Sequence, residues 1–151
     1  MSGFHVRYLT TFRLKTIGGE CSNLRVVKLE YLPDGSSECP LIRLYEFDQS
    51  EARQLRQLVK SMVSGDLQVV ALQNEVWVDP VGGCCLSLRR GNRDQGIRQA
   101  RTLQFECVLS PDGWSNVEGL IEPFCQSQTF GFQWLTHDGG IGLLISRSGQ
   151  W

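Results

Sequence analysis

Two adjacent thiols and a distant histidine are the residues of this chain whose types suit nucleophilic catalysis. Cys84 and Cys85 follow two consecutive glycines, a flexible turn whose backbone amides can stabilise an oxyanion. Further along the chain, His137 and Asp138 are the types of residue that serve as a base and as the group that orients it. These residues support one hypothesis, a small thiol-dependent hydrolase or transferase that uses Cys84 or Cys85 with His137. Nothing in the sequence brings the two pairs together, and His-Asp-Gly-Gly is also typical of a hairpin tip.

The cysteines have a plainer interpretation as structural thiols. The chain contains six of them, and its N-terminal residues lack the apolar stretch of a secretory signal. We therefore expect a cytoplasmic protein, whose thiols stay reduced. The adjacent pair, Cys84 and Cys85, would need a badly distorted peptide to form a disulfide. Buried, unmodified thiols are the simpler expectation.

Neither a metal site nor a cofactor is predicted. The chain has two histidines, His5 and His137, near its opposite ends. Zinc sites usually begin with two ligands close in sequence, and the one close pair here, Cys84 and Cys85, would point to opposite faces of a strand. The glycine-rich segment 139–142 leads into a predicted strand, so it lacks the helix N-terminus that holds a phosphate group.

The strongest local charge bias lies between residues 89 and 101. This segment contains five arginines and one acidic residue, Asp94, which gives it a net charge of +4. The chain as a whole is nearly neutral, with 15 basic and 16 acidic residues. Arginine is suited to paired hydrogen bonds with carboxylates. The arginines that we expect to bind a partner are Arg89, Arg90, Arg93, Arg98 and Arg101.

An acidic protein surface is the partner that this arginine segment favours. Single-stranded nucleic acid would require aromatic side chains among the cations, and the segment contains none. The near-neutral overall charge gives no general attraction to nucleic acid or acidic membranes, and no apolar run approaches membrane-spanning length. The plainer alternative is a solvated hairpin whose charges protect an exposed strand edge. We therefore favour a non-enzymatic cytoplasmic binding or regulatory protein that acts through protein–protein contacts.

A helix predicted over residues 48–64 is the element around which the rest of the chain is organised. Apolar residues recur about every 3.6 positions along it and would form one buried stripe. Asp48 and Glu51 have capping-box spacing at its start, and Gly65 supplies the left-handed residue that commonly ends a helix. The opposite face is polar, so the helix is predicted to cover a sheet. The stripe consists of Ala52, Leu55, Leu58, Val59 and Met62.

Most of the remaining chain has the pattern of β-strands. The segment 4–17 alternates apolar and polar residues over an unusual length, as expected for a strand with one buried face. A second, short helix is predicted over residues 115–122, where Pro123 would end it. The sequence thus predicts a single α+β domain, residues 1–151, with a large, mainly antiparallel sheet of about eight or nine strands covered by the two helices. The predicted strands are 4–17, 24–32, 41–47, 67–72, 75–81, 84–90, 97–110, 129–136 and 141–146.

The predicted C-terminal hairpin carries apolar residues on both faces of its strands. On its first strand, Phe132 and Trp134 lie on one face and Leu135 on the other. Two-sided apolarity favours a central or helix-covered position in a sheet. We therefore expect both strands of the hairpin to contribute to the core, through Phe130, Phe132, Trp134, Ile141, Leu143 and Ile145.

Overall fold

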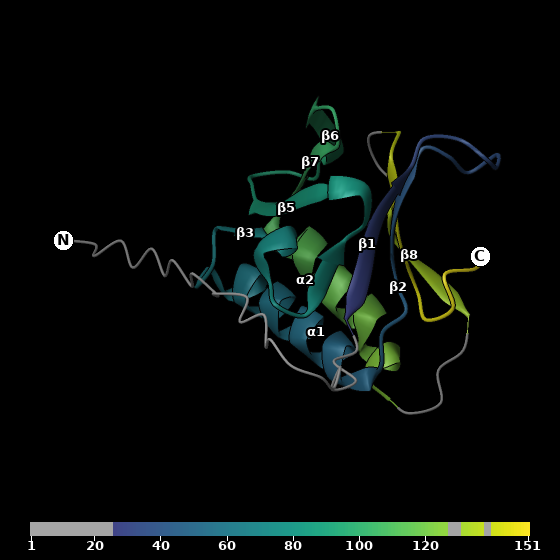
Figure 1. Ribbon diagram of the computed structural model, residues 1–151. Helices are drawn as coiled ribbons and strands as arrows, with labels where there is room; N and C mark the ends of the chain where they lie inside the picture. Colours follow the sequence, from purple (N-terminus) through teal and green to yellow (C-terminus); the bar gives the residue numbers. More distant parts are fainter. Residues whose placement is uncertain (1–25, 127–130, 138–139) are drawn as a thin grey trace, which may run out of the picture.

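The structure, a computed structural model shown in Figure 1, describes residues 26–126, 131–137 and 140–151 of the chain. The predicted strand 4–17 lies outside these residues. Within them the chain forms nine strands, two α-helices and three short 3₁₀-helices. The helices are α1 (Gln49–Ser64), α2 (Pro111–Ile121), η1 (Leu72–Asn74), η2 (Val81–Gly83) and η3 (Glu122–Cys125). The strands are β1 (Val27–Leu32), β2 (Leu41–Tyr45), β3 (Val69–Ala71), β4 (Val78–Pro80), β5 (Cys85–Arg90), β6 (Gly96–Arg101), β7 (Gln104–Leu109), β8 (Phe132–Thr136) and β9 (Gly142–Ser146).

The described strands are divided between two sheets. One has five strands in the order β4-β1-β2-β9-β8, and the other has four in the order β3-β5-β7-β6. In the five-stranded sheet β1 is antiparallel to β2 and β8 is antiparallel to β9, whereas β1–β4 and β2–β9 are parallel pairs. In the four-stranded sheet β3–β5 and β6–β7 are antiparallel and β5–β7 is parallel. Both sheets are therefore mixed.

The predicted fold class is wrong in its central feature, one large and mainly antiparallel sheet beneath a long helix and a short one. The chain is α+β, but with two mixed sheets and with a second helical stretch, 111–125, that is nearly as long as α1. Alternation of apolar and polar residues identifies a strand and its buried face, but it does not identify the neighbouring strand. Parallel neighbours need a crossover connection, and here the partners β2 and β9 stand far apart in the chain.

Helix α1 begins and ends where the sequence predicts. The Asp48 side chain accepts hydrogen bonds from the backbone amides of Ser50 and Glu51, at 2.8 and 3.2 Å. These bonds satisfy two of the amides that the first turn leaves without partners. Gly65 ends the helix with φ 86°. Of the predicted stripe, Leu58 is half-buried against the core and the others, Ala52, Leu55, Val59 and Met62, are buried.

Helix α2 begins earlier than the predicted 115–122. Ser110 is its N-cap and accepts a hydrogen bond from the Gly113 amide at 3.1 Å, and Pro111 occupies the first turn. Proline suits this position because the missing N–H has no partner there in any helix. The residues Ser-Pro-Asp-Gly also fit a turn, which is why the helix start was assigned too late. The earlier start brings Trp114 into the core.

A chain reversal that the sequence did not indicate separates β6 from β7. The predicted strand 97–110 is interrupted at Thr102 and Leu103, and Leu103 adopts φ 59°. Neither residue is among the usual turn formers, so the sequence carried no turn signal. Beyond the reversal, Phe105, Cys107 and Leu109 of β7 are buried.

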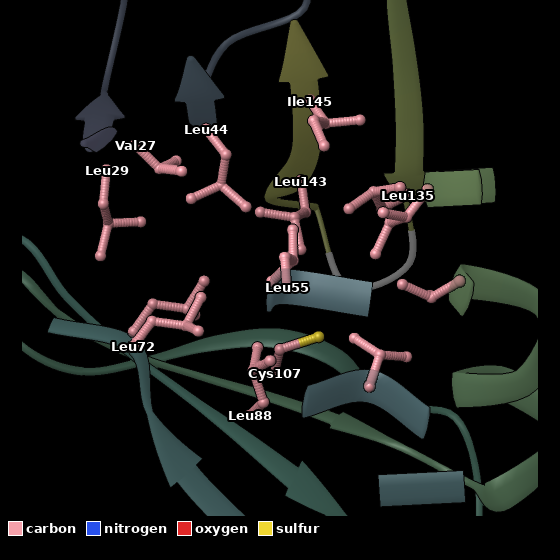
Figure 2. Close-up of a cluster of buried hydrophobic side chains, with 14 of the residues drawn as sticks. Val27, Leu29, Leu44, Leu55, Leu72, Leu88, Cys107, Leu135, Leu143 and Ile145 are labelled. Atoms are coloured by element: carbon pink, nitrogen blue, oxygen red, sulfur yellow. The ribbon is translucent and has the colours of Figure 1, made fainter. Parts of the chain in front are cut away.

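The inner faces of both sheets share one hydrophobic core with the two helices (Figure 2). Leu29, Leu44 and Leu143 project from the five-stranded sheet toward Leu88 and Cys107 of the four-stranded sheet. The rings of Tyr31 in β1 and Phe105 in β7 are 4.5 Å apart and link the sheets directly. Helices α1 and α2 pack against each other, and neither is long and apolar enough to cross a membrane. The polar residues left outside this core form the candidate sites.

Candidate binding surface on the four-stranded sheet

Strand β6 forms one edge of the four-stranded sheet and carries two of the predicted arginines. In the described part of the chain β6 pairs with β7 alone, so its other side has no neighbouring strand. The first two residues of β6 are buried, and the last four, Arg98 to Arg101, are exposed. The β6–β7 hairpin projects from the body of the molecule, at the top of Figure 1. No described strand pairs with this edge, which therefore offers its backbone groups for pairing.

The five arginines have three kinds of environment, of which Arg90 has the last to be described. Arg93, Arg98 and Arg101 are exposed and make no ion pair or side-chain hydrogen bond with any described residue. Arg89 is also exposed, but it forms an ion pair with Glu106 of β7. Arg98 lies directly opposite the same glutamate in the β6–β7 ladder. The surface therefore combines one neutralised pair with three free cations.

Arg90 has a structural environment that the other four arginines lack. It is half-buried, and its guanidinium lies against Gly65, where a Cβ atom would be 3.0 Å from Nη1. Gly65 caps the C-terminus of α1, where the carbonyl groups create a negative potential that favours a cation. The Arg90 backbone amide also donates to the Gln68 carbonyl at 2.8 Å. We therefore separate Arg90 from the partner-binding group.

The loop between β5 and β6 is held in place by Asp94. The Asp94 carboxylate accepts hydrogen bonds from the Ser110 amide at 2.9 Å and from the Ser110 hydroxyl at 2.8 Å. Ser110 in turn caps α2, so the loop is attached to the start of that helix. The only acidic residue of segment 89–101 is thereby engaged within the fold. It forms no ion pair with any described arginine.

The structure does not bring the predicted thiol site together. Cys84 is fully buried, and burial raises the pKa of its thiol to about 12. The Cys85 thiol is half-buried and donates to the Gly83 carbonyl at 3.5 Å. Helix η2, which directly precedes Cys84, contacts β1, whereas His137 directly follows β8. Strands β1 and β8 are three positions apart in the five-stranded sheet, or roughly 14 Å at the usual spacing between strands. Asp138 lies outside the described residues.

His137 has a different neighbour from the one predicted. The His137 ring is exposed and lies 4.3 Å from the ring of Trp134.

The environment of Cys84 does not favour catalysis. A buried thiol with a raised pKa is a poor nucleophile, because the thiolate is the reactive form. Among the described residues, no three His, Cys, Asp or Glu side chains gather in a way that could hold a metal ion.

A second surface feature, which the sequence analysis missed, lies on the outer face of the five-stranded sheet. Phe132 and Trp134 were predicted to lie in the core, but Phe132 is 46% exposed and Trp134 is half-buried. Leu135 is the β8 residue that points inward. Together with the C-terminal residues, Phe132 and Trp134 line an open hollow of about 570 Å³. The apolar residues on both faces of β8 were the one sequence signal from which exposed aromatic residues on this strand could have been inferred.

Comparison of the chain with protein-family models, with curated proteins and with solved structures finds no match.

Proposed function

We propose that this is a non-enzymatic binding protein that captures an acidic, extended segment of another protein at the edge of β6. The observation that carries the proposal is the set of three exposed arginines, Arg93, Arg98 and Arg101, that have no described ion-pair partner. They lie on and beside the edge of β6 that pairs with no other described strand. An added strand would receive main-chain hydrogen bonds from the open edge. Its carboxylates would pair with the arginine side chains, which suit bidentate contacts.

The local charges support this choice of partner. Arg89 and Glu106 neutralise each other, and the four remaining arginines of segment 89–101 outnumber Asp94, so the remaining charge is positive. No aromatic residue lies between residues 89 and 101, which disfavours the stacking that single-stranded nucleic acid requires. A positive edge attracts acidic segments and repels basic ones before contact is made. The proposed partner is therefore a protein.

The proposed compartment is the cytoplasm. The five cysteines within the described residues, Cys39, Cys84, Cys85, Cys107 and Cys125, are all free. Thiols persist in compartments that are kept reducing, which supports this assignment.

A binding measurement with single charge reversals tests the proposal. The probe is a fluorescently labelled peptide of alternating glutamate and threonine, and its anisotropy is followed at low ionic strength, where screening is weakest. Arg98→Glu and Arg101→Glu should each weaken binding by about fivefold to tenfold, because an attraction is replaced by a repulsion. Arg53→Glu is the matched control, since Arg53 is an exposed residue of α1 without an ion pair among the described residues.

The same experiment can contradict the proposal. If Arg53→Glu weakens binding as much as Arg101→Glu, the peptide responds only to total charge. If the wild-type protein does not bind the probe at low ionic strength, the arginines serve only to protect the strand edge from aggregation. The melting temperature of each variant checks that the fold is intact, and it should stay within a degree or two because all three arginines are exposed.

A further inference from the structure

The outer face of the five-stranded sheet is partly covered by the last residues of the described chain. Arg43 in β2 donates from Nη1 to the Gly149 carbonyl at 2.7 Å, and Ser146 donates from Oγ to the Gln150 carbonyl at 2.7 Å. These bonds fold residues 147–151 back across the sheet. Beside them lies the hollow of about 570 Å³, a size suited to a small ligand or a long side chain.

Aromatic rings form the walls of this hollow. Trp151 and Phe132 are 36% and 46% exposed, and the half-buried Trp134 lines the hollow with them. The Trp134 ring is held over Gly142 of β9, so closely that a Cβ atom there would be 2.5 Å from the ring. Two exposed aromatic side chains and a half-buried one at the same place on a surface are typical of a binding site.

Glu38 supplies a negative charge at the rim of the hollow. Hydrogen bonds from its own backbone amide and from the hydroxyls of Ser36 and Ser37 lower the pKa of the Glu38 carboxyl, so it is ionised at neutral pH. It lines the hollow, and it makes no ion pair with any described residue. The Trp151 side chain also donates a hydrogen bond to this carboxylate, so Glu38 places a negative charge without an ion-pair partner among the described residues beside an aromatic wall of the hollow.

The cation within the hollow, Arg43, is already committed to the fold. Its Nε and Nη2 donate to the Glu30 carboxylate at 2.8 and 2.5 Å, which neutralises its charge. Its guanidinium lies 4.0 Å from the centre of the Tyr45 ring. Arg43 thus forms part of the wall and holds the C-terminal segment, and it does not offer a free charge to an anion.

We propose that this hollow binds an organic cation, a guanidinium or ammonium group on an alkyl chain. The rings of Trp134, Trp151 and Phe132 would contact the cation through their negative faces, and Glu38 would act as its counter-ion. The group belongs either to an arginine or lysine side chain of a peptide or to a free amine. This site is separate from the arginines of β6 and selects the opposite charge.

The tryptophans of the full-length chain provide a direct readout. The chain has four, of which Trp77 and Trp114 are buried in the core and Trp134 and Trp151 line the hollow. The probes are acetyl-arginine amide, its neutral isostere acetyl-citrulline amide, and choline, titrated into ¹⁵N-labelled protein. Acetyl-arginine amide or choline should shift the indole signals of Trp134 and Trp151 and leave those of Trp77 and Trp114 in place.

The comparison among probes distinguishes the source of the cation. Tighter binding of the arginine probe indicates a peptide side chain, and tighter binding of choline indicates a free quaternary amine. Acetyl-citrulline amide should bind about tenfold more weakly than acetyl-arginine amide, since it has the same shape without the charge. Equal binding of these two probes, or no indole shift with either cation, would overturn the proposal.

Two variants of one turn test the role of the carboxylate. Glu38→Gln should weaken cation binding by about fivefold to tenfold. Asp34→Asn removes a charge from the same exposed turn, but Asp34 does not line the hollow, so binding should be unchanged. Equal effects of the two substitutions would show that the hollow does not use Glu38, and the proposal would be wrong. An unchanged Trp114 signal verifies that each variant is folded.

Discussion

The two edge strands β6 and β8 place opposite chemistry at the surface of the same protein. β6 ends the four-stranded sheet with exposed arginines and no aromatic ring, and β8 ends the five-stranded sheet with exposed rings and no cation. The arginines on the two sides also differ. Arg43 is held by two partners and a ring, whereas Arg98 and Arg101 have no described partner.

This difference shows that residue type alone does not decide what an arginine does. A guanidinium with a carboxylate, a carbonyl and a ring around it stabilises the fold, because removing it leaves those partners unsatisfied. An exposed guanidinium without partners contributes little to stability and remains available for binding. The arginines at the edge of β6 are thus free to contact a partner, as we propose. On the outer face of the five-stranded sheet, Arg43 is held within the fold and lines the hollow.

The largest contrast in stability is expected between Trp134 and Arg98. Trp134→Ala should lower the free energy of unfolding by about 2–4 kcal/mol, because a half-buried ring and its packing on Gly142 are lost. Arg98→Ala should lower it by less than about 0.5 kcal/mol. Denaturation with urea measures both values. If both variants lose a comparable free energy of unfolding, Arg98 also stabilises the fold, and the two edge strands do not differ in this respect.

A smaller effect should separate the two kinds of arginine directly. Arg43→Ala should cost about 1–3 kcal/mol, since the Glu30 carboxylate and the Gly149 carbonyl both lose a charged donor. Arg101→Ala, the matched change at the other edge, should cost less than about 0.5 kcal/mol. A double-mutant cycle with Glu30→Ala should give a coupling energy for Arg43 and Glu30. If that coupling is absent, Arg43 stabilises the protein only through its contacts with Tyr45 and the C-terminal segment.

The hydrophobic core between the two sheets should exclude water, and the buried thiol of Cys84 tests this expectation. Burial raises the pKa of the Cys84 thiol from 9.0 to about 12, so the unfolded chain releases this proton at lower pH than the folded one. The contribution to stability is complete below pH 9 and is lost as pH rises toward 12, by at most about 1.4 kcal/mol per pH unit.

The measurement is the slope of unfolding free energy against pH in wild type and in Cys84→Ala. Tyr45 and Lys28, whose pKa values are also raised, are present in both proteins, so the difference in slope isolates Cys84. The wild type should lose stability more steeply above pH 9. Identical slopes, or rapid alkylation of Cys84 at neutral pH, would show that water reaches the thiol.

The smallest effect is expected within the arginine segment itself. Arg90→Ala should lower stability by about 0.3–1 kcal/mol, because a cation is removed from the C-terminal end of α1. Arg93→Ala should have no measurable effect, since its side chain is exposed in the loop. Thermal unfolding at low and high salt measures the difference, which should shrink as salt screens the helix dipole. The reverse ranking would place Arg93 in the fold and return Arg90 to the binding surface.

The candidate sites were predictable to different degrees. The arginine segment could be predicted because a local excess of charge is read directly from the residue types. The sequence does not distinguish Arg90 from Arg93. That distinction depends on Gly65, which is brought beside Arg90 by the fold. The hollow was not predicted at all, because its parts come from a turn, two strands and the C-terminal segment. The pairing of Cys84 with His137 was a hypothesis about proximity, which residue types alone cannot support.

The sequence by itself determined the local elements of this protein. Helix α1 follows from apolar residues at helical spacing between Asp48 and Gly65, and the burial of Phe105 and Cys107 follows from the alternation of polar and apolar residues in the first half of β7. Both are properties of adjacent residues. Tertiary structure decided that β2 lies beside β9 and β5 beside β7, since parallel pairing joins strands through long connections that leave no trace in either strand. It also decided which face of β8 is buried: with apolar residues on both faces, the packing of Leu135 against the core places Phe132 and Trp134 outside.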